Sequence, residues 1–273
     1  MPLLGAPAGP VFRLFSSVES KVFQLGLTTS VPVWKGELDS VTALAKFQKT
    51  QSYYDAQVGA TYVRKLEEGR SLGLTASFGS ASDKPFKDSS VDTVGATAFY
   101  SWKEAPSSSW LLLLNYSNNR PVWNNIPLTG FVYSYMPSRN FRGSFGAPFA
   151  SVMWRFAERW ALNAFTVVPW VYRSNIGYDL SERLQLFAGF DLGQQTFLRF
   201  GRTDSKERVY FDEKRATVGL RTPPMAPVSA ELEAGYAFGR RIFEAESYGD
   251  TKVNLVELEA GPVVRLNLTV ALR

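Results

Sequence analysis

From Arg183 onward, this chain alternates apolar and polar residues over one run after another, with almost no helical periodicity. In the first run every second residue from Leu184 to Leu192 is apolar, and most of the positions between are polar or glycine. A second run, from Val228 to Phe238, repeats the pattern. A period of two predicts β-strands with one apolar and one polar face. Such strands suit a barrel with lipid outside and water or a polar plug inside.

The length and composition are compatible with one barrel domain. The chain has 273 residues, enough for one large all-β unit or two small domains. No stretch resembles a linker, so we expect a single domain over residues 1–273. No run reaches the roughly 18 apolar residues that a membrane-spanning helix needs. Aromatic residues make up 14% of the chain, as expected of a barrel with aromatic girdles at the membrane interfaces.

The chain contains neither cysteine nor histidine. Catalytic triads and dyads that need an imidazole base are therefore excluded, as are metal sites built from thiolates or histidines. There is also no phosphate-binding loop, EF-hand loop or dinucleotide fingerprint. We therefore expect no enzyme activity, no catalytic residue, no metal site and no cofactor.

Compact polar turns recur between the alternating runs. They cover residues 64–70, 156–160 and 179–183, with similar segments at 34–38 and 222–227. Longer polar connections cover residues 80–90, 118–146, 201–207 and 247–251. Outer-membrane barrels have short periplasmic turns and longer extracellular loops. If all the compact turns face one side, the number of strands between any two of them must be even.

This constraint predicts an all-β fold, a single closed antiparallel transmembrane β-barrel of about 12–14 strands, with both chain ends on the periplasmic side. The expected strands cover residues 10–17, 21–33, 39–49, 54–64, 70–80, 91–103, 108–117, 146–157, 160–168, 171–180, 183–200, 207–221, 228–246 and 252–272. In the strand that includes Leu72, we expect Leu72, Leu74 and Phe78 on the lipid face, and small residues such as Ser71 and Gly73 on the inner face.

Six aromatic residues stand beside the expected short turns, and we interpret them as one interfacial girdle. They are Trp34, Tyr62, Trp102, Trp110, Trp160 and Tyr178. Tryptophan also occurs at strand ends in soluble β-sandwiches, which is the alternative interpretation.

The polar face becomes charged in the last strands. The candidate lumen-lining charges are Arg183, Asp191, Arg215, Arg221, Glu231, Glu233, Glu257, Glu259 and Arg265. Acids and bases on neighbouring strands can pair across the ladder. The set could be a structural ion-pair lattice in a narrow lumen, a charged wall that selects solutes, or a catalytic carboxylate pair. Alternation alone places Glu231 with Glu233 and Glu257 with Glu259 on one face, so their spacing does not indicate glycosidase chemistry.

The long segment 118–146 offers a candidate constriction loop. It carries Arg120, Arg139 and Arg142 together with Tyr133, Tyr135 and Phe141. If this segment is extracellular, it could fold into the barrel mouth. The alternative is an ordinary solvated loop.

Charge and the chain start bear on partners and location. The net charge is +5, but basic residues are spread along the chain, which argues against nucleic acid as a partner. We expect contact with outer-membrane lipid, and with lipopolysaccharide through Arg202, Lys206 and Lys252. The first six residues lack the basic and apolar regions of a signal peptide. Because an exported barrel needs a signal peptide, we expect that the signal peptide was removed.

Two motifs carry a family resemblance. The segment 175–186, NIGYDLSERLQL, and the segment 232–241, LEAGYAFGRR, resemble an uncharacterised, porin-like family of bacterial outer-membrane β-barrel proteins. The resemblance covers the C-terminal half, from about Gly146, and the second motif is the more specific. It implies a barrel in the bacterial outer membrane and no particular activity. One departure is the C-terminal Arg273, where such barrels usually end in an aromatic residue.

Three functions remain open at this point. The first is a small porin or narrow channel in the outer membrane with a charged lumen. The second is an occluded barrel that acts as a structural or interaction component of an envelope complex, with other envelope proteins as partners. The third is a soluble β-barrel that binds a ligand, in which the face of Leu184 would be core instead.

Overall fold

The computed structural model describes residues 11–17, 23–32, 39–50, 52–167, 171–222 and 228–270. Over these ranges the chain forms seventeen β-strands and two short 3-10 turns. The strands are β1 (Val11–Ser17), β2 (Phe23–Pro32), β3 (Asp39–Thr50), β4 (Tyr53–Lys65), β5 (Ser71–Ser82), β6 (Asp92–Ala105), β7 (Ser108–Ser117), β8 (Leu128–Ser138), β9 (Phe141–Ala147), β10 (Phe149–Ala157), β11 (Trp160–Val167), β12 (Val171–Ser181), β13 (Leu184–Phe197), β14 (Arg208–Arg221), β15 (Val228–Ala245), β16 (Val253–Leu258) and β17 (Gly261–Val270).

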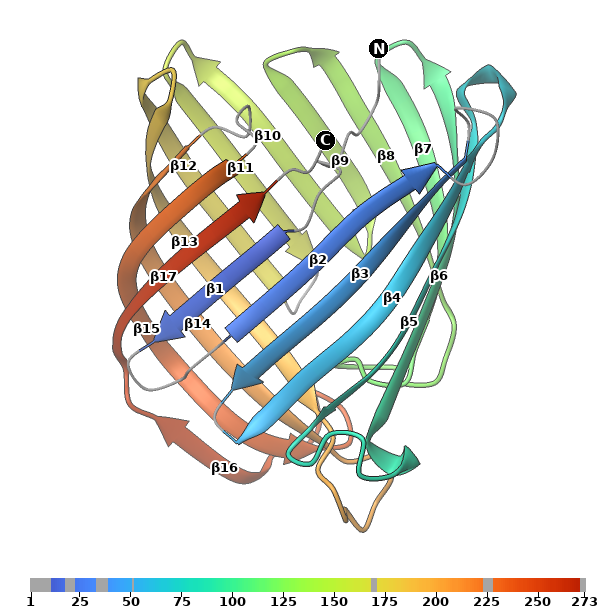
Figure 1. Ribbon diagram of the computed structural model, residues 1–273, viewed down its shortest axis with the longest axis vertical. Coiled ribbons are helices and arrows are strands. Elements are labelled where there is room, and N and C mark those ends of the chain that lie inside the picture. Colours follow the sequence, from blue (N-terminus) through green and yellow to red (C-terminus); the bar gives the residue numbers. More distant parts are fainter. Residues whose placement is uncertain are drawn as a thin grey trace.

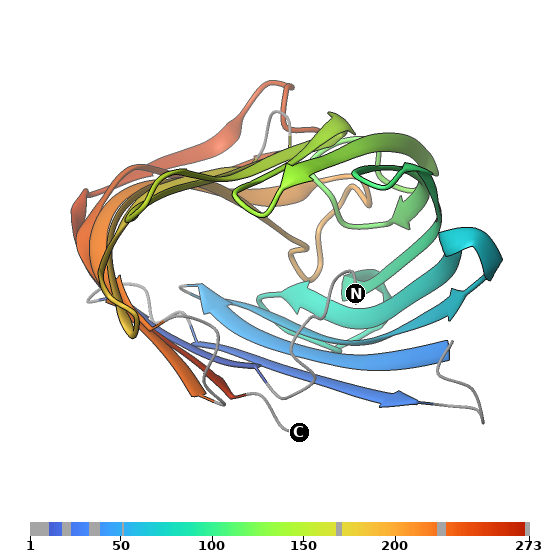
Figure 2. The same ribbon diagram turned by 90° about the horizontal axis from the view of Figure 1, so that it is seen from above.

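All the strands belong to one antiparallel sheet (Figure 1). Each strand from β1 to β15 pairs with the next strand in the chain. The long strand β15 then pairs with β17 over its first part and with β16 over its last part. β17 also pairs with β1. Seen from above, the sheet curls round on itself (Figure 2).

The contacts between distant strands define the inner face of the sheet. Ala81 in β5 packs in one cluster with Phe197 in β13. These strands are not neighbours in the ladder, so both side chains must lie on the concave face. Leu72, Leu74 and Phe78 have the opposite parity in β5, and they are 48%, 52% and 48% exposed on the outer face. The expected division of this strand into an apolar and a small-residue face is confirmed.

The strand pattern is largely as the sequence predicts. Each of the fourteen predicted strands overlaps an observed one. The structure divides the predicted strand 252–272 into β16 and β17, because β15 changes its pairing partner beyond Gly239, a residue with φ of 57°. The prediction of one long connection over 118–146 was wrong, because most of that segment forms the hairpin of β8 and β9.

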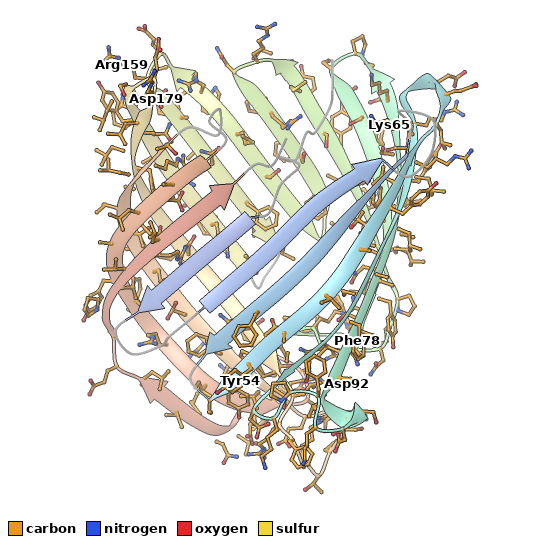
Figure 3. The ribbon with its side chains drawn as sticks, viewed as in Figure 1. Tyr54, Lys65, Phe78, Asp92, Arg159 and Asp179 are labelled. Atoms are coloured by element: carbon orange, nitrogen blue, oxygen red, sulfur yellow. The ribbon has the colours of Figure 1, made fainter. Side chains whose placement is uncertain are left out.

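The two ends of the sheet differ. The turns after β4, β6, β8, β10 and β12 are short and lie at one end, with Lys65, Arg159 and Asp179 (Figure 3). Longer connections after β5, β7, β13 and β15 lie at the other end, with Phe78 and Asp92. Two strands separate each short turn from the next, so the predicted even count is confirmed. We call these the short-turn end and the long-loop end; β1 begins and β17 ends at the short-turn end.

Candidate functional site: the inner face of the sheet

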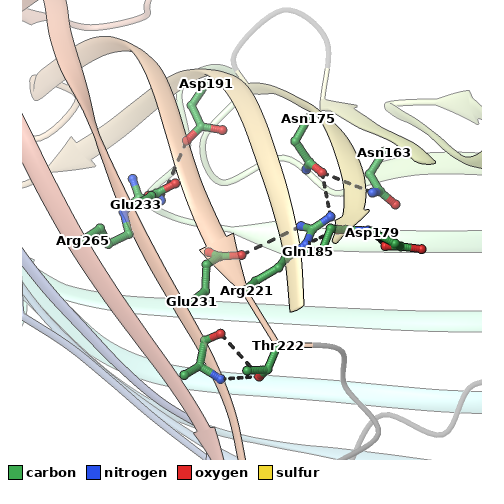
Figure 4. A network of polar contacts seen from close by, with 11 residues as sticks. Asn163, Asn175, Asp179, Gln185, Asp191, Arg221, Thr222, Glu231, Glu233 and Arg265 are labelled. Carbon is green, nitrogen blue, oxygen red and sulfur yellow. Dashed lines mark hydrogen bonds and ion pairs between the residues drawn. The ribbon is translucent and has the colours of Figure 1, made fainter. Parts of the chain in front are cut away.

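Six of the nine predicted inner charges form three pairs of opposite charge directly across the ladder. Asp191 is in register with Arg215, Arg221 with Glu231, and Glu233 with Arg265. The nearest nitrogen and oxygen atoms of these pairs are 3.5, 3.9 and 2.6 Å apart. Alternating residues of antiparallel strands meet on one face, so the register itself creates these contacts. Figure 4 shows Arg221 with Glu231 and Glu233 with Arg265.

Further contacts join the pair of Asp191 and Arg215 to the pair of Glu233 and Arg265 in an ion-pair lattice. Arg265 also lies 3.8 Å from Asp191, and Arg215 lies 3.3 Å from Glu213. The guanidinium of Arg240 is 3.1 Å from the other oxygen of Glu213. Positive and negative groups alternate through the lattice, so their charges largely cancel. This arrangement favours the ion-pair interpretation of the inner charges over a wall with a strong net charge.

Arg221 anchors a second polar group on the same face. Its Nε donates to Oε1 of Gln185 at 2.6 Å, and its Nη2 donates to Oδ1 of Asn175 at 3.0 Å. The guanidinium also lies 5.0 Å from the ring centroid of Phe187. Phe187 has the parity of the polar face and is 5% exposed. The alternation from Leu184 to Leu192 did not reveal this contact between Phe187 and Arg221.

Three of the predicted inner charges lie outside both the lattice and the group around Arg221. Glu257 in β16 is exposed and in register with Arg241, far along β15 from Glu231 and Glu233. Glu259 is exposed between β16 and β17, where its backbone oxygen accepts a hydrogen bond from Arg240. Arg183 is exposed in the turn between β12 and β13. The break between β16 and β17 interrupts the alternation, so Glu257 and Glu259 do not join the other two glutamates.

The candidate constriction residues are not brought together. Arg139 and Arg142 lie in the β8–β9 turn and in β9, at the short-turn end. Arg120 lies in the connection from β7 to β8, at the long-loop end. There its Nη1 donates to Oδ1 of Asn115 at 3.1 Å and its Nη2 to the backbone oxygen of Ile126 at 2.5 Å, and its partial burial lowers the pKa of its guanidinium. Arg120 therefore holds its own loop together, and the three candidate residues do not form one constriction.

The inner face of the wall formed by β4 to β9 carries mainly uncharged polar groups. Hydroxyl and amide groups face each other across its ladder. The pairs are Thr61–Thr75 at 2.9 Å, Ser71–Ser101 at 2.6 Å, Thr97–Asn115 at 2.7 Å and Ser134–Ser144 at 2.9 Å. Not every glycine on this wall leaves free space beside it. A Cβ built on Gly73 would lie 2.1 Å from the ring of Phe99, so glycine is required where this inner ring crosses β5.

Near the long-loop end, apolar side chains from facing walls meet on the inner face. The inner apolar cluster consists of the buried Ala81, Phe197, Val209 and Phe211 with Tyr53, Ile242 and Leu258 packed against it. The two walls also touch through their backbones, because the amide of Leu198 donates to the oxygen of Ala81 at 2.7 Å. Ser82 and Leu198 form an isolated parallel bridge at the same place. The space inside the curled sheet is therefore crossed at this level.

The long connections form a loop network beyond the inner apolar cluster. From the β13–β14 connection, Arg202 Nη2 donates to the oxygen of Ser90 at 2.6 Å. From the β7–β8 connection, Asn119 Nδ2 donates to the oxygen of Thr196 at 3.0 Å. The hydroxyl of Tyr248 is 3.1 Å from Asp212, and its pKa is raised by burial and then by the charge of that carboxylate. Loops from opposite walls thus hold one another across this end.

An aromatic belt surrounds part of the outer face at the short-turn end. Trp102 and Trp110 stack with their ring centroids 6.4 Å apart, and Trp160 lies 4.9 Å from Tyr178. Tyr62 is exposed on β4; Trp34 lies outside the described residues. The belt also includes Tyr133, Tyr135 and Phe141 of the unpredicted hairpin. These three rings face outward, so they do not contribute to a constriction.

A second group of outer aromatic residues lies towards the long-loop end. Phe78 and Phe86 have ring centroids 6.1 Å apart. On the opposite part of the sheet Tyr172 contacts Phe190, which contacts Phe238, at 6.1 and 6.4 Å. Only the belt beside the short turns was expected from the sequence. A pair of belts with apolar side chains between them is typical of the outer face of a membrane barrel.

The described residues contain no group of three or more acidic side chains arranged to hold a metal ion. No helix in the described part of the chain is long and apolar enough to span a membrane. No protein-family model, curated protein or solved structure matches this chain. The resemblance to outer-membrane barrel proteins therefore stays a prediction.

The contact between Glu233 and Arg265 can be tested by substitution. Replacing Arg265 with methionine leaves the buried carboxylate of Glu233 without its closest cation, and we expect the free energy of unfolding to fall by about 2 kcal/mol. Urea unfolding of the protein in detergent micelles measures this change. Adding Glu233→Gln to Arg265→Met should recover part of the loss. A double variant as unstable as the sum of the two single variants would show that these groups are not coupled.

Proposed function

We propose that this protein is an outer-membrane β-barrel of a bacterium, in which the curled sheet closes into a transmembrane barrel. The observation that carries the proposal is the outer face, where large apolar side chains are exposed on strand after strand from β4 to β17. A soluble protein rarely exposes a contiguous apolar surface of this extent. Closure is supported by β1, which pairs with β17 along one edge and with β2 along the other.

The two ends fit the usual orientation of such barrels, with short turns in the periplasm and longer loops outside the cell. Lipid then contacts the outer face between the two aromatic belts. Lipopolysaccharide would meet the long-loop end, where Lys206 is exposed. Arg202 and Lys252 are less free to contact it, because Arg202 is tied to Ser90 and Lys252 lies 4.6 Å from the ring centroid of Phe243.

Within this class, we propose a small porin or narrow channel with a charged lumen that is closed in the present conformation. The support is the hydrophilic inner face, with an ion-pair lattice on one wall and hydroxyl groups on the other. Such a surface suits a water-filled passage. The barrier is the inner apolar cluster near the long-loop end, because apolar constrictions in channels can exclude water.

A second candidate is an occluded barrel that serves as a structural component of an envelope complex with other envelope proteins. The direct backbone hydrogen bond between Leu198 and Ala81 favours it, since a permanent contact of facing walls would leave no passage. In either case the protein is not expected to be an enzyme, and neither candidate needs a cofactor.

The membrane proposal is tested by refolding the protein with and without detergent. We expect a folded, monodisperse β-protein in detergent micelles and in lipid vesicles, and aggregation in plain buffer. Far-UV circular dichroism and gel mobility before and after heating would report folding. A monodisperse folded protein in plain buffer would contradict the membrane proposal and favour the soluble ligand-binding alternative.

A further inference from the structure

A hollow opens on the surface beside the turn that joins β4 to β5, at the short-turn end. Its volume is about 440 Å³, and it is lined by Glu68, Arg70, Tyr100, Trp102 and Lys103. The first two side chains come from the turn, and the other three from the last part of β6. The hollow therefore lies where the first aromatic belt meets the polar turn. Its two aromatic residues belong to the outer face, because Tyr100 is in register with the exposed Leu72 and Trp102 has the same parity.

The turn has a specific shape that holds these groups in place. Glu68 and Gly69 both have left-handed backbone conformations, with φ of 57° and 73°. A Cβ built on Gly69 would lie 2.8 Å from Cδ of Lys103. The aliphatic stem of Lys103 thus packs directly on the glycine, and a larger residue there would push it away.

The charged side chains that line the hollow, one acidic and two basic, have a net positive charge. Arg70 is already paired, because its Nη2 lies 2.5 Å from a carboxylate oxygen of Glu68. No ion pair joins Lys103 to an acidic side chain of the described residues. A flexible ammonium of this kind binds a phosphate well as a point charge. The neighbouring guanidinium adds further donors.

The surroundings of the hollow favour an amphipathic ligand. Tyr100 and Trp102 stack with ring centroids 5.7 Å apart on one side of it. Below the turn, Leu72 and Leu74 continue the exposed apolar surface of β5. A ligand with an anionic head and hydrocarbon chains could satisfy the lysine and cover these side chains at the same time. Free phosphate would leave the apolar part uncovered.

We propose that this hollow binds the headgroup of one glycerophospholipid, with the phosphate against Lys103 and Arg70 and the acyl chains along the outer face of β5 and β6. The inference rests on the proposed membrane location. It adds a defined lipid site to the general lipid contact of the outer face. The site lies on the leaflet next to the short turns, which is the periplasmic leaflet in the proposed orientation.

The test uses the full chain refolded in detergent micelles, with dioleoylphosphatidylethanolamine as the probe and native mass spectrometry as the measurement. Wild-type protein should retain one lipid molecule under conditions that remove loosely bound lipid. Lys103→Gln should bind this lipid about tenfold more weakly, because a charge-assisted hydrogen bond is lost. Lys65→Gln is the matched control, because Lys65 is exposed in the same region (Figure 3) but does not line the hollow.

The outcomes separate the lipid site from the barrel. Equal retention by wild type and Lys103→Gln, both folded in micelles, would overturn the lipid site and leave the barrel proposal standing. Displacement of the lipid by excess inorganic phosphate would also overturn it, since the hollow would then be a simple anion site. Failure of the wild type to fold in micelles, with folding in plain buffer, would instead overturn the barrel on which the site depends.

Discussion

Replacing both Phe197 and Phe211 with serine should convert a nearly silent protein into a conducting pore. Both rings are buried in the inner apolar cluster. Serine removes much of the apolar contact that holds the facing walls together. Even if only one of the two rings contributes fully, the closed state loses about 3 kcal/mol of stability relative to the conducting state. Each 1.4 kcal/mol changes an equilibrium constant tenfold, so we expect the conducting state to gain about a hundredfold in population.

Single-channel recording in a planar lipid bilayer measures this effect. Wild-type protein should show rare, brief current steps, and the double variant should show frequent ones. Phe187→Ser is the matched control, because Phe187 is a buried inner ring of the same strand, β13, but packs on Arg221 outside the cluster. Equal activity of wild type and double variant would show that the cluster is not the barrier. A double variant that is folded but silent would favour the occluded, structural barrel.

Replacing Val58, which lies midway along β4 on the outer face, with arginine should destabilise the protein strongly, although Val58 is 60% exposed. In a soluble protein such an exposed substitution changes stability by only about 0.5 kcal/mol. In a membrane barrel an arginine near the bilayer midplane of the lipid face costs about 3 kcal/mol. The measurement is equilibrium unfolding in lipid vesicles, where the variant should lose this amount of unfolding free energy.

Leu72→Arg provides a control for membrane depth. Leu72 lies on the outer face of β5 and is 48% exposed, but it is in register with Tyr100, which stacks on Trp102 of the aromatic belt. Arginine near the interface costs about 1 kcal/mol or less. Two variants with equal, small losses would argue that lipid does not surround this face.

The period of two and the polar turns together predict most of the fold, because both depend on local chemistry. Alternation determines which face a residue occupies, and this is why Asp191 and Arg215 were expected on the same inner face, where the register of β13 and β14 brings them together. The hairpin of β8 and β9 was not predicted, because Gly130, Pro137 and Gly146 interrupt its alternation of apolar and polar residues. Glycine and proline are also typical of loops. The outward Tyr133 of the hairpin was therefore assigned to a loop.

The inner apolar cluster could not be found from single strands, because its members come from opposite walls of the sheet. One signal was nevertheless present. Tyr53, Ala81, Phe197 and Val209 are apolar residues on the polar face, and each lies at the long-loop end of its strand. Apolar residues that break the alternation at the same end of several strands indicate contact across the interior. The positions of Glu257 and Glu259 were also not predictable. They depend on the change of β15 from pairing with β17 to pairing with β16, and no local sequence pattern specifies that change.

The β8–β9 hairpin shows how a protein of this architecture can change size. Inserting or deleting one hairpin alters the sheet by two strands, so every other strand keeps its direction and both chain ends stay on the same side. The outward Tyr133 of this hairpin still contacts Trp110 of the neighbouring strand. Joining β7 directly to β10 removes both strands of the hairpin and keeps the antiparallel order. Removing only one of the two strands would make the new neighbours parallel. Relatives of this protein should therefore differ in circumference by whole hairpins.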